Sequence, residues 1–359
     1  MGTQLISNAE GTLDLPYIRR IADQIAALRK GGREVTVVSS GAIGAGCAEL
    51  GLAKRPRNVT ALQAVAAVGQ RRLMTRMHDA FSRHNLPVGQ VLLTRDDFDD
   101  RVRFLNIRNC VTHLHSLGCV PIINENDTVA VEELEALRVG ENDLLAAMIC
   151  NALRADALIL LTVVDGLEDT SGQCIDLVDE VQRSLEYVRC ERSSLGKGGM
   201  YSKLAAAKLV TDAGEIVVIA NGRERNVLPR LFDGEKIGTV ILPANRKLDS
   251  RQRWIALTAR PTGQVTIDDG AARAITARGK SLLATGIMEA TGHFERGEIL
   301  LVRDQKGCEI ARGLSNYSAG EVRLIMGKRS NQFEKILGRP AYDEVIHRDN
   351  MVVKTCPEA

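Results

Sequence analysis

The sequence predicts an α/β protein, with a mostly parallel sheet covered by helices on both faces, followed by a small β-rich domain. Apolar strand candidates alternate with amphipathic helices up to about residue 245, and this alternation is typical of parallel sheets. The pattern changes at the polar, basic segment 243–253, and the predicted elements become shorter after Pro261. At 359 residues the chain is also longer than an average single domain.

The first predicted elements are a helix and a strand. Apolar residues recur at three- and four-residue steps from Ile18 to Leu28, between Pro16 and the pair Gly31-Gly32, which indicates an amphipathic helix. Residues 34–39 (EVTVVS) are apolar and β-branched, so they predict a buried parallel strand.

Further strands are predicted from similar runs in both domains. They span residues 88–93, 119–123, 157–162 and 215–219 in the first domain, and 263–267, 298–303 and 309–313 in the second. We expect a first domain at 1–245, a linker at 246–261, a second domain at 262–340 and a tail at 341–359.

The composition is that of an ordinary globular protein. Hydrophobic residues make up 45% of the chain, charged residues 26%, and the formal net charge is +2. So small a net charge provides no global field that demands a nucleic-acid partner. The eight cysteines form no C-x-x-C pair, and neither a secretory leader nor a long apolar run occurs, so we expect reduced thiols in a cytoplasmic protein without a membrane segment.

A histidine pair and four polar stretches are the candidate functional features. His113 and His115 lie two apart on a predicted helix and point in different directions, which favours a helix end over a metal site. The other stretches lie at strand ends or helix starts, where ligands of α/β sheets bind. They are residues 39–42, 124–128, 140–143 and 196–203.

The first three stretches each have a plain structural alternative. The turn Ser39-Ser40-Gly41-Ala42 lets backbone N–H groups approach an anion, but a purely structural turn explains it equally well. Residues 124–128 (NENDT) follow a strand and residues 140–143 (GEND) begin a helix, so a solvated turn and a simple N-cap are the alternatives. Together, the last two could hold an ammonium group and orient a polar substrate.

Residues 196–203 (GKGGMYSK) give the strongest local signal, a glycine-rich loop that runs into the helix KLAAAKLV. The spacing does not match a Walker A loop, because Gly199 is not followed by Lys-Ser or Lys-Thr. The stretch still combines glycines, a helix N-terminus and the mobile charge of Lys203, which are the ingredients of phosphate binding. A flexible surface loop with incidental lysines is the alternative.

Taken in order, seven segments resemble the glutamate 5-kinases of the amino acid kinase family. They are SSGAI (39–43), LQAVAAVGQ (62–70), GQVLLTRDDF (89–98), RFLNIRN (103–109), PIINENDTV (121–129), GENDLLAA (140–147) and GKGGMYSK (196–203). The resemblance implies a three-layer α/β/α sandwich, and residues 262–340 are similar to the PUA domain appended to many members. It also implies transfer of the ATP γ-phosphoryl group to the side-chain carboxylate of L-glutamate, the first step of proline synthesis.

The resemblance also implies roles for single residues. Lys203, Asp143 and Gly41 would be catalytic: Lys203 contacts the ATP phosphates, Asp143 organises the catalytic lysines, and Gly41 meets the transferring phosphoryl group. Mg²⁺ would be held mainly by ATP, with no dedicated metal motif. Glutamate would be bound by Ser40, Asn124, Asp127 and Asn142, and ATP by Thr162, Val163, Lys197, Gly198, Gly199, Met200, Tyr201, Ser202 and Lys203.

The front of the chain departs from the family pattern. Members begin with a strand that carries a phosphate-contacting lysine before a Gly-Thr turn, whereas this chain starts Met1-Gly2-Thr3 and keeps only the turn. We expect about ten further residues upstream, with an apolar run and a lysine; the alternative is a truncated, weakly active enzyme. Val163 stands where members often have Asp, and Lys197 stands where they often have a small hydroxyl residue.

Two other interpretations stay open. A kinase of the same family acting on acetylglutamate, aspartate, carbamate or uridylate is disfavoured by the NENDTV and GENDLLAA segments. An RNA-binding protein with an inactive kinase scaffold would use the basic residues of the PUA-like segment, which has few aromatic residues for stacking on bases. The resemblance further suggests a homo-oligomer that proline inhibits.

Overall fold

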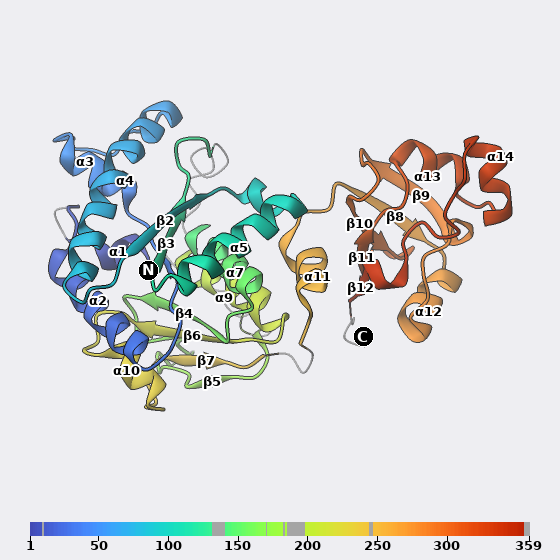
Figure 1. Cartoon of the computed structure of the whole chain (residues 1–359). Coiled ribbons are helices and arrows are strands. Elements are labelled where there is room, and N and C mark those ends of the chain that lie inside the picture. The colour runs from blue at the N-terminus through green and yellow to red at the C-terminus, as the bar shows by residue number, and fades with distance from the viewer. Residues whose placement is uncertain are drawn as a thin grey trace. The chain divides into compact units, whose positions relative to one another are not determined.

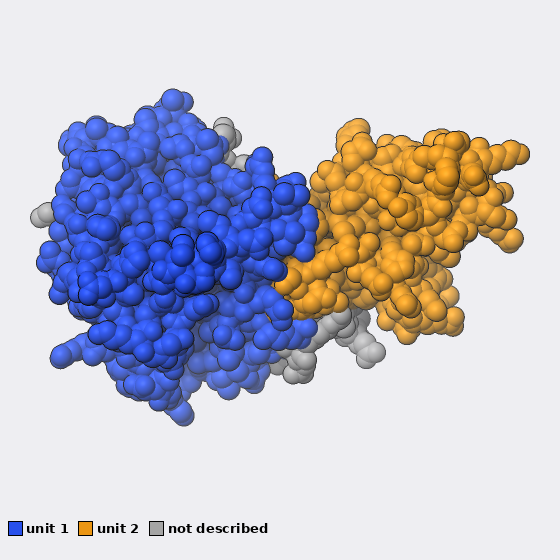
Figure 2. All heavy atoms as spheres, viewed as in Figure 1, with its two compact units in different colours: residues 1–247 blue, residues 248–359 orange. Residues whose placement is uncertain are grey.

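The computed structural model describes residues 1–8, 11–130, 141–169, 171–181, 184, 198–243 and 247–354 (Figure 1). The chain divides into two compact units, residues 1–247 and 248–359 (Figure 2). Each unit encloses a hydrophobic core of its own. Among the described residues, no helix has the length and apolar character needed to cross a bilayer.

The first unit alternates helices and strands. Its elements are α1 (Thr3–Ile6), α2 (Leu15–Lys30), β1 (Val37–Val38), α3 (Ala42–Glu49), α4 (Val59–Ser82), β2 (Val88–Leu93), the 3-10 helix η1 (Arg95–Phe98), α5 (Arg101–Ser116), β3 (Val120–Glu125), α7 (Glu141–Leu153), β4 (Ala157–Thr162), β5 (Leu177–Val178), α9 (Gly198–Thr211), β6 (Ile216–Asn221), α10 (Val227–Phe232) and β7 (Thr239–Ile241).

Two layers of helices enclose the strands of this unit, as expected for an α/β/α sandwich. On one side α2 packs against α4 and α10, and their apolar faces share a core with β1, β3, β4 and β6. On the other side α7 packs against α5 and α9, and a second core joins α7 and α9 to β4, β6 and β7. The helix predicted around residues 18–28 is α2, which begins after the Asp14 N-cap with Pro16 in its first turn and ends at Lys30.

The described strands of this unit form two sheets rather than one continuous sheet (Figure 1). The first has the order β1-β3-β2 and is entirely parallel. The second has the order β4-β6-β7-β5, with β4 parallel to β6, β7 antiparallel to β6, and β5 parallel to β7. The predicted strand at 34–39 shrinks to Val37–Val38, because within the described chain β1 has a hydrogen-bonded neighbour on one edge only.

A cavity of about 1640 Å³ separates the two sheets. It is lined along its length by residues of both β1 and β4, the end strands of their sheets, and neither strand pairs with another described strand on the cavity side. At one end of the cavity, the Met1 nitrogen donates a hydrogen bond to the Val38 carbonyl oxygen at 2.8 Å. The backbone edges that face the cavity are therefore open to further strand pairing.

The second unit is a small β-rich domain. Its elements are α11 (Ser250–Arg253), the π-helical turn η3 (Trp254–Thr258), β8 (Gly263–Ile267), α12 (Asp269–Arg278), the 3-10 helix η4 (Ala284–Gly286), β9 (Ile287–Gly292), β10 (Ile299–Arg303), β11 (Glu309–Leu314), α13 (Ala319–Ile325), the 3-10 helix η5 (Ser330–Gln332), α14 (Phe333–Leu337), the 3-10 helix η6 (Arg348–Asn350) and β12 (Met351–Val353). The strands form one sheet in the order β12-β11-β10-β8-β9.

Two segments outside the expected domain cores carry regular structure. The expected linker, 246–261, contains α11 and η3, because the Asp249 carboxylate caps the helix start and Trp254 is buried behind it. The expected tail, 341–359, contains β12, which pairs antiparallel with β11. Both segments are integrated into the second unit because each contributes buried side chains or backbone pairing to it.

Candidate active site

The polar end of the cavity collects residues from five segments that are distant in sequence. The segments are the turn after β1, the end of β3 with the residues that follow it, the start of α7, the end of β4, and the first turns of α9. The site residues on this cavity are Ser40, Gly41, Asn124, Asp127, Asn142, Asp143, Thr162, Val163, Gly199, Met200, Ser202 and Lys203.

The turn after β1 requires glycine at position 41. Gly41 has φ +97° in the left-handed region, and a Cβ there would lie 2.6 Å from Cδ1 of Ile6. Gly41 precedes α3, whose first N–H groups have no partners within the helix, so the turn offers free donors to an anion. The neighbouring Ser40 hydroxyl accepts a hydrogen bond from Asn142 Nδ2 at 2.8 Å. Residues 102 positions apart therefore meet at this turn.

Asn124 lies at the end of β3 and is 2% exposed. Its Nδ2 donates to Oε1 of Gln70 on α4 at 2.8 Å. Asp127 follows in the turn after β3 and is half-buried on the same cavity, together with Glu125. Carboxylate and amide oxygens thus gather on this wall, which suits a positively charged or hydrogen-bond-donating group of a ligand.

Asp143 links α7 to α9. Its Oδ2 accepts a hydrogen bond from Lys203 Nζ at 2.9 Å and another from the Ser202 hydroxyl at 3.0 Å. The side chains of Lys203 and Asp143 are 12% and 15% exposed, so this ion pair is largely shielded from water and weakly screened by salt. The pairing fixes the lysine ammonium at the cavity wall.

The stretch 196–203 differs in part from the loop that the sequence predicts. α9 begins at Gly198, so residues 198–203 form the first turns of a helix rather than a loop. Lys203 therefore lies one and a half turns into α9. Lys197 lies outside the described residues.

One predicted nucleotide contact, Tyr201, does not line the cavity. Tyr201 packs against the core that α7, α9 and the second sheet share. Helical geometry explains the difference, since Tyr201 and Lys203 are two positions apart and point to different faces. At the end of β4, Thr162 accepts from the Gly222 backbone N–H at 2.8 Å, and the 40% exposed Val163 lines the cavity.

His113 and His115 are both on α5 and do not converge. His113 Nδ1 contacts the Ser116 hydroxyl at 3.2 Å, while His115 Nε2 contacts the Thr36 hydroxyl at 2.8 Å. Burial lowers the pKa of His115 below its ordinary value, although Glu34 acts in the opposite direction. No cluster of three or more His, Cys, Asp or Glu side chains suited to a metal occurs in the described part of the chain.

Sequence patterns did not single out two side chains near the site. Gln70 contacts Asn124 but belongs to a long amphipathic helix, where one glutamine carries no signal of its own. Arg55 lines the cavity from the exposed loop between α3 and α4, and loop cations are too common to predict a site.

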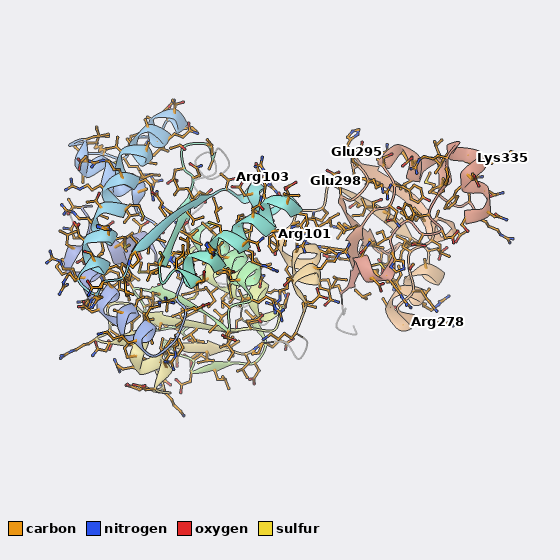
Figure 3. All side chains as sticks on the ribbon, in the orientation of Figure 1. Arg101, Arg103, Arg278, Glu295, Glu298 and Lys335 are labelled. Carbon is orange, nitrogen blue, oxygen red and sulfur yellow. The ribbon has the colours of Figure 1, made fainter. Side chains whose placement is uncertain are left out.

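Four basic side chains of the second unit can be placed individually. Arg278 ends α12 and Lys335 lies in α14, and Figure 3 shows them at well-separated positions on this unit. Arg312 is paired with Glu309 at 2.7 Å, and Arg303 donates to the Gly307 carbonyl at 2.7 Å. Both cations therefore already have partners within the second unit.

Comparison with known proteins assigns both units. The model of the amino acid kinase family matches residues 1–221, and the PUA domain model matches residues 263–337. A glutamate 5-kinase of Caldanaerobacter subterraneus subsp. tengcongensis is 44% identical over 98% of this chain and 96% of its own length. One from Geobacter sulfurreducens is 42% identical over the same shares.

Solved structures of lower similarity also match the chain. A UMP kinase of Bacillus anthracis has a TM-score of 0.43 at 15% identity, covering 67% of this chain and 92% of its own. The sequence identity to glutamate 5-kinases over nearly the whole chain, rather than the similarity to this distant structure, establishes the family. The chain belongs to the amino acid kinase family, in its glutamate 5-kinase branch with a C-terminal PUA domain.

Proposed function

We propose that this chain transfers the γ-phosphoryl group of ATP to the side-chain carboxylate of L-glutamate, forming L-glutamyl 5-phosphate in the first step of proline biosynthesis. The observation that carries the proposal is the meeting of residues 40–41, 124–127, 142–143 and 199–203 at one cavity. Relatives that are 42–44% identical over 98% of the chain carry the name glutamate 5-kinase.

Phosphoryl transfer depends on aligning two anions and on neutralising the charge that develops between them. The free N–H groups around Gly41 and the ammonium of Lys203 supply positive charge at the two ends of the site. Asp143 holds Lys203 in place, and Ser202 supports the same carboxylate. We assign the catalytic roles to Lys203, Asp143 and Gly41.

The glutamate site is proposed at Ser40, Asn124, Asp127 and Asn142. Carboxylate and amide oxygens on this wall would accept hydrogen bonds from the substrate α-ammonium group, and Asn142 would be held by its bond to Ser40. The unpartnered Oδ1 of Asn142, buried in the described structure, is a further acceptor for a ligand donor.

The ATP site is proposed at the end of β4 and the first turns of α9, with Thr162, Val163, Gly199, Met200, Ser202 and Lys203. Mg²⁺ is expected with ATP, where it would neutralise phosphate charge. Glu125 and Asp127 line the same cavity and provide oxygen atoms of the kind that Mg²⁺ prefers, so the residues present fit the ion.

A coupled assay of ADP formation tests the proposal. L-glutamate, acetylglutamate, aspartate, carbamate and UMP are offered separately, each with ATP and Mg²⁺. We expect turnover with L-glutamate, and none when Mg²⁺ is chelated. Turnover on a nucleotide or carbamate, with none on glutamate, would overturn the proposal.

Membership of the family supports two further proposals, inhibition by proline and assembly as a homo-oligomer, together with a cytoplasmic location. Adding L-proline to the glutamate assay tests the first, and light scattering on the purified chain tests the second. Full activity in saturating proline, or a monomer at assay concentrations, would contradict the respective proposal.

A further inference from the structure

Gln70 is a buried polar residue of α4 that the proposed reaction leaves without a role. It is 8% exposed, and its Oε1 accepts the hydrogen bond from Asn124 Nδ2 at 2.8 Å. Its Nε2 has no acceptor among the described residues. Burying a carboxamide with one unsatisfied end is unfavourable. Packing alone therefore does not explain a glutamine at position 70.

The backbone holds Gln70 at a fixed distance from the site. α4 crosses α3 with direct backbone contact, since a Cβ on Gly69 would lie 1.8 Å from the Ala42 carbonyl oxygen. On the opposite helix, a Cβ on Gly46 would lie 1.9 Å from the Val65 carbonyl oxygen. Only glycine at both positions permits this approach. Gln70 follows Gly69 directly, so the crossing sets its position relative to the Gly41 turn.

The bond to Gln70 decides which way the Asn124 carboxamide faces. A carboxamide is planar, with the donor nitrogen and the acceptor oxygen on opposite sides. When Nδ2 is directed at Gln70, Oδ1 lies on the other side of the group, and Asn124 lines the cavity. The hydrogen bond found for the Asn124 carboxamide among the described residues is the one from Nδ2, and Asn124 lines the cavity. Oδ1 remains available to a ligand.

We propose that Gln70 is a positioning residue that fixes the Asn124 carboxamide with its oxygen toward the substrate, where it accepts a hydrogen bond from the α-ammonium group. The inference rests on the proposed function, because it names L-glutamate as the substrate. Without Gln70 the carboxamide is free to rotate, and its reversed orientation presents an N–H donor to the ammonium group. Gln70 thereby contributes to selection of amino acids over plain dicarboxylates.

The test compares L-glutamate with glutarate, which has both carboxylates but no amino group. Gln70→Met retains side-chain length and removes the hydrogen bond, whereas Gln70→Glu retains an acceptor for Asn124 Nδ2. For each variant we measure KM and kcat with glutamate, the Ki of glutarate as a competitor, and KM for ATP. Gln63→Met, on the same helix, is the control, because Gln63 contacts the Ala130 carbonyl and not Asn124.

In Gln70→Met, we expect kcat/KM for glutamate to fall about tenfold or more, as for a lost hydrogen bond to a charged group. The Ki of glutarate and the KM for ATP should stay within about twofold. Asn124→Ala should give the same loss, and the double variant should lose no more than either single variant, since the two residues act as a unit. Gln70→Glu should retain most of the preference for glutamate.

Equal losses for glutamate and glutarate in Gln70→Met would overturn the inference, because a general packing defect affects both ligands alike. Additive losses in the double variant would overturn it as well. Failure of the proposed function is distinguishable, since the unmodified chain would then show no glutamate-dependent ADP formation. Should Gln70→Met fail to fold, Gln70→Glu and Asn124→Ala still decide the outcome: loss of glutamate preference in Gln70→Glu contradicts the inference, and its retention beside a loss in Asn124→Ala supports it.

Discussion

Lys203 is the residue to which we assign charge neutralisation. The sequence predicted its role from a glycine-rich approach to a helix, but its ion pair with Asp143 connects residues 60 positions apart and no local pattern contains it. Gly41 is the opposite case, because a glycine directly after a strand predicts a tight turn, and the turn has φ +97°. Local backbone demands are visible in sequence, whereas side-chain partners are not.

Replacing Lys203 by alanine should reduce kcat by about 10²-fold or more, since the ammonium serves the charge that develops during transfer. KM for glutamate should change little, because the lost interaction matters more to the transition state than to substrate capture. Steady-state kinetics provide the measurement. Lys208→Ala on the same helix is the matched control, since Lys208 pairs with Asp212 and does not line the cavity. A kcat equal to that of the control would remove Lys203 from its proposed role.

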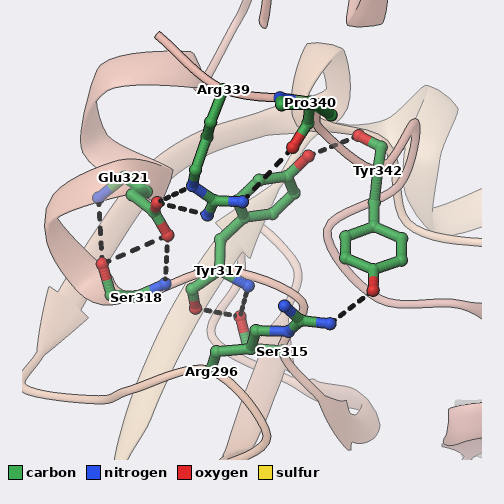
Figure 4. A network of polar contacts seen from close by, with 8 residues as sticks. All are labelled: Arg296, Ser315, Tyr317, Ser318, Glu321, Arg339, Pro340 and Tyr342. Atoms are coloured by element: carbon green, nitrogen blue, oxygen red, sulfur yellow. Dashed lines mark hydrogen bonds and ion pairs between the residues drawn. The ribbon is translucent and has the colours of Figure 1, made fainter. Parts of the chain in front are cut away.

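Glu321 gives a pH-dependent prediction in the second unit. It accepts hydrogen bonds from the Ser318 backbone N–H and from Arg339 (Figure 4). Burial raises the pKa of Glu321, but these bonds outweigh burial and the net pKa lies below its usual value. A depressed pKa means that the contribution to stability is complete above the ordinary pKa of about 4.3, and is lost as pH falls through the folded-state value.

Glu321→Gln should therefore lower the free energy of unfolding at pH 7 by about 0.5–1 kcal/mol, and the difference from the unmodified chain should shrink below about pH 4. Urea unfolding followed by the fluorescence of Trp254, the single tryptophan, measures it. Trp254 is buried in the second unit. The exposed Glu334→Gln serves as control. A difference that is unchanged at pH 3.5 would contradict the assignment to charge.

Several elements could be identified from pattern alone, and the reason is periodicity. The strand predicted at 88–93 is β2, the one at 157–162 is β4, and the one at 263–267 is β8. β5 and β12 were not predicted, because strands of two or three residues show no measurable alternation. β1 was predicted too long, because strand length also depends on which neighbours are available for pairing.

The cavity between β1 and β4 predicts that an added strand would stabilise the first unit. An extended segment of about six apolar residues, fused before Met1, could pair with both open edges, since neighbouring strands lie about 4.8 Å apart. The bond from the Met1 nitrogen to Val38 already lies on this path. Burial of apolar surface and new backbone hydrogen bonds should raise the Tm by about 3 °C or more.

Differential scanning calorimetry measures this effect against a Gly/Ser extension of equal length. Equal Tm values for the two extensions would show that the cavity does not accept a strand. The same comparison in the glutamate assay would reveal whether closing the cavity also raises activity.

The molecule as a whole combines a kinase unit with a PUA domain, and the two units differ in where their paired charged side chains lie. In the kinase unit, Lys203 and Asp143 face a cavity, whereas Arg312 and Glu309 of the PUA domain pair within the fold. The PUA fold by itself assigns no ligand. Arg278 and Lys335 lie at well-separated positions on the PUA domain (Figure 3).

We expect weak RNA binding by the full chain, with an affinity that falls steeply as salt rises, because surface cations bind phosphate without specific base contacts. Gel-shift titration with a structured RNA at 50 mM and 150 mM salt tests this. Tight, salt-resistant binding, particularly in a chain without glutamate-dependent ATP turnover, would instead favour an RNA-binding protein on a kinase scaffold.

The alternation of strands and helices was enough to indicate the α/β architecture, and the order of seven segments indicated the family, because turns, helix starts and strand periods are local properties of the backbone. Three features depended on the folded chain: the pairing of Lys203 with Asp143, the contact of Gln70 with Asn124, and the division into two sheets. Each joins segments far apart in sequence. Such contacts arise only when packing brings distant elements together, and a local sequence pattern does not show which distant elements will meet.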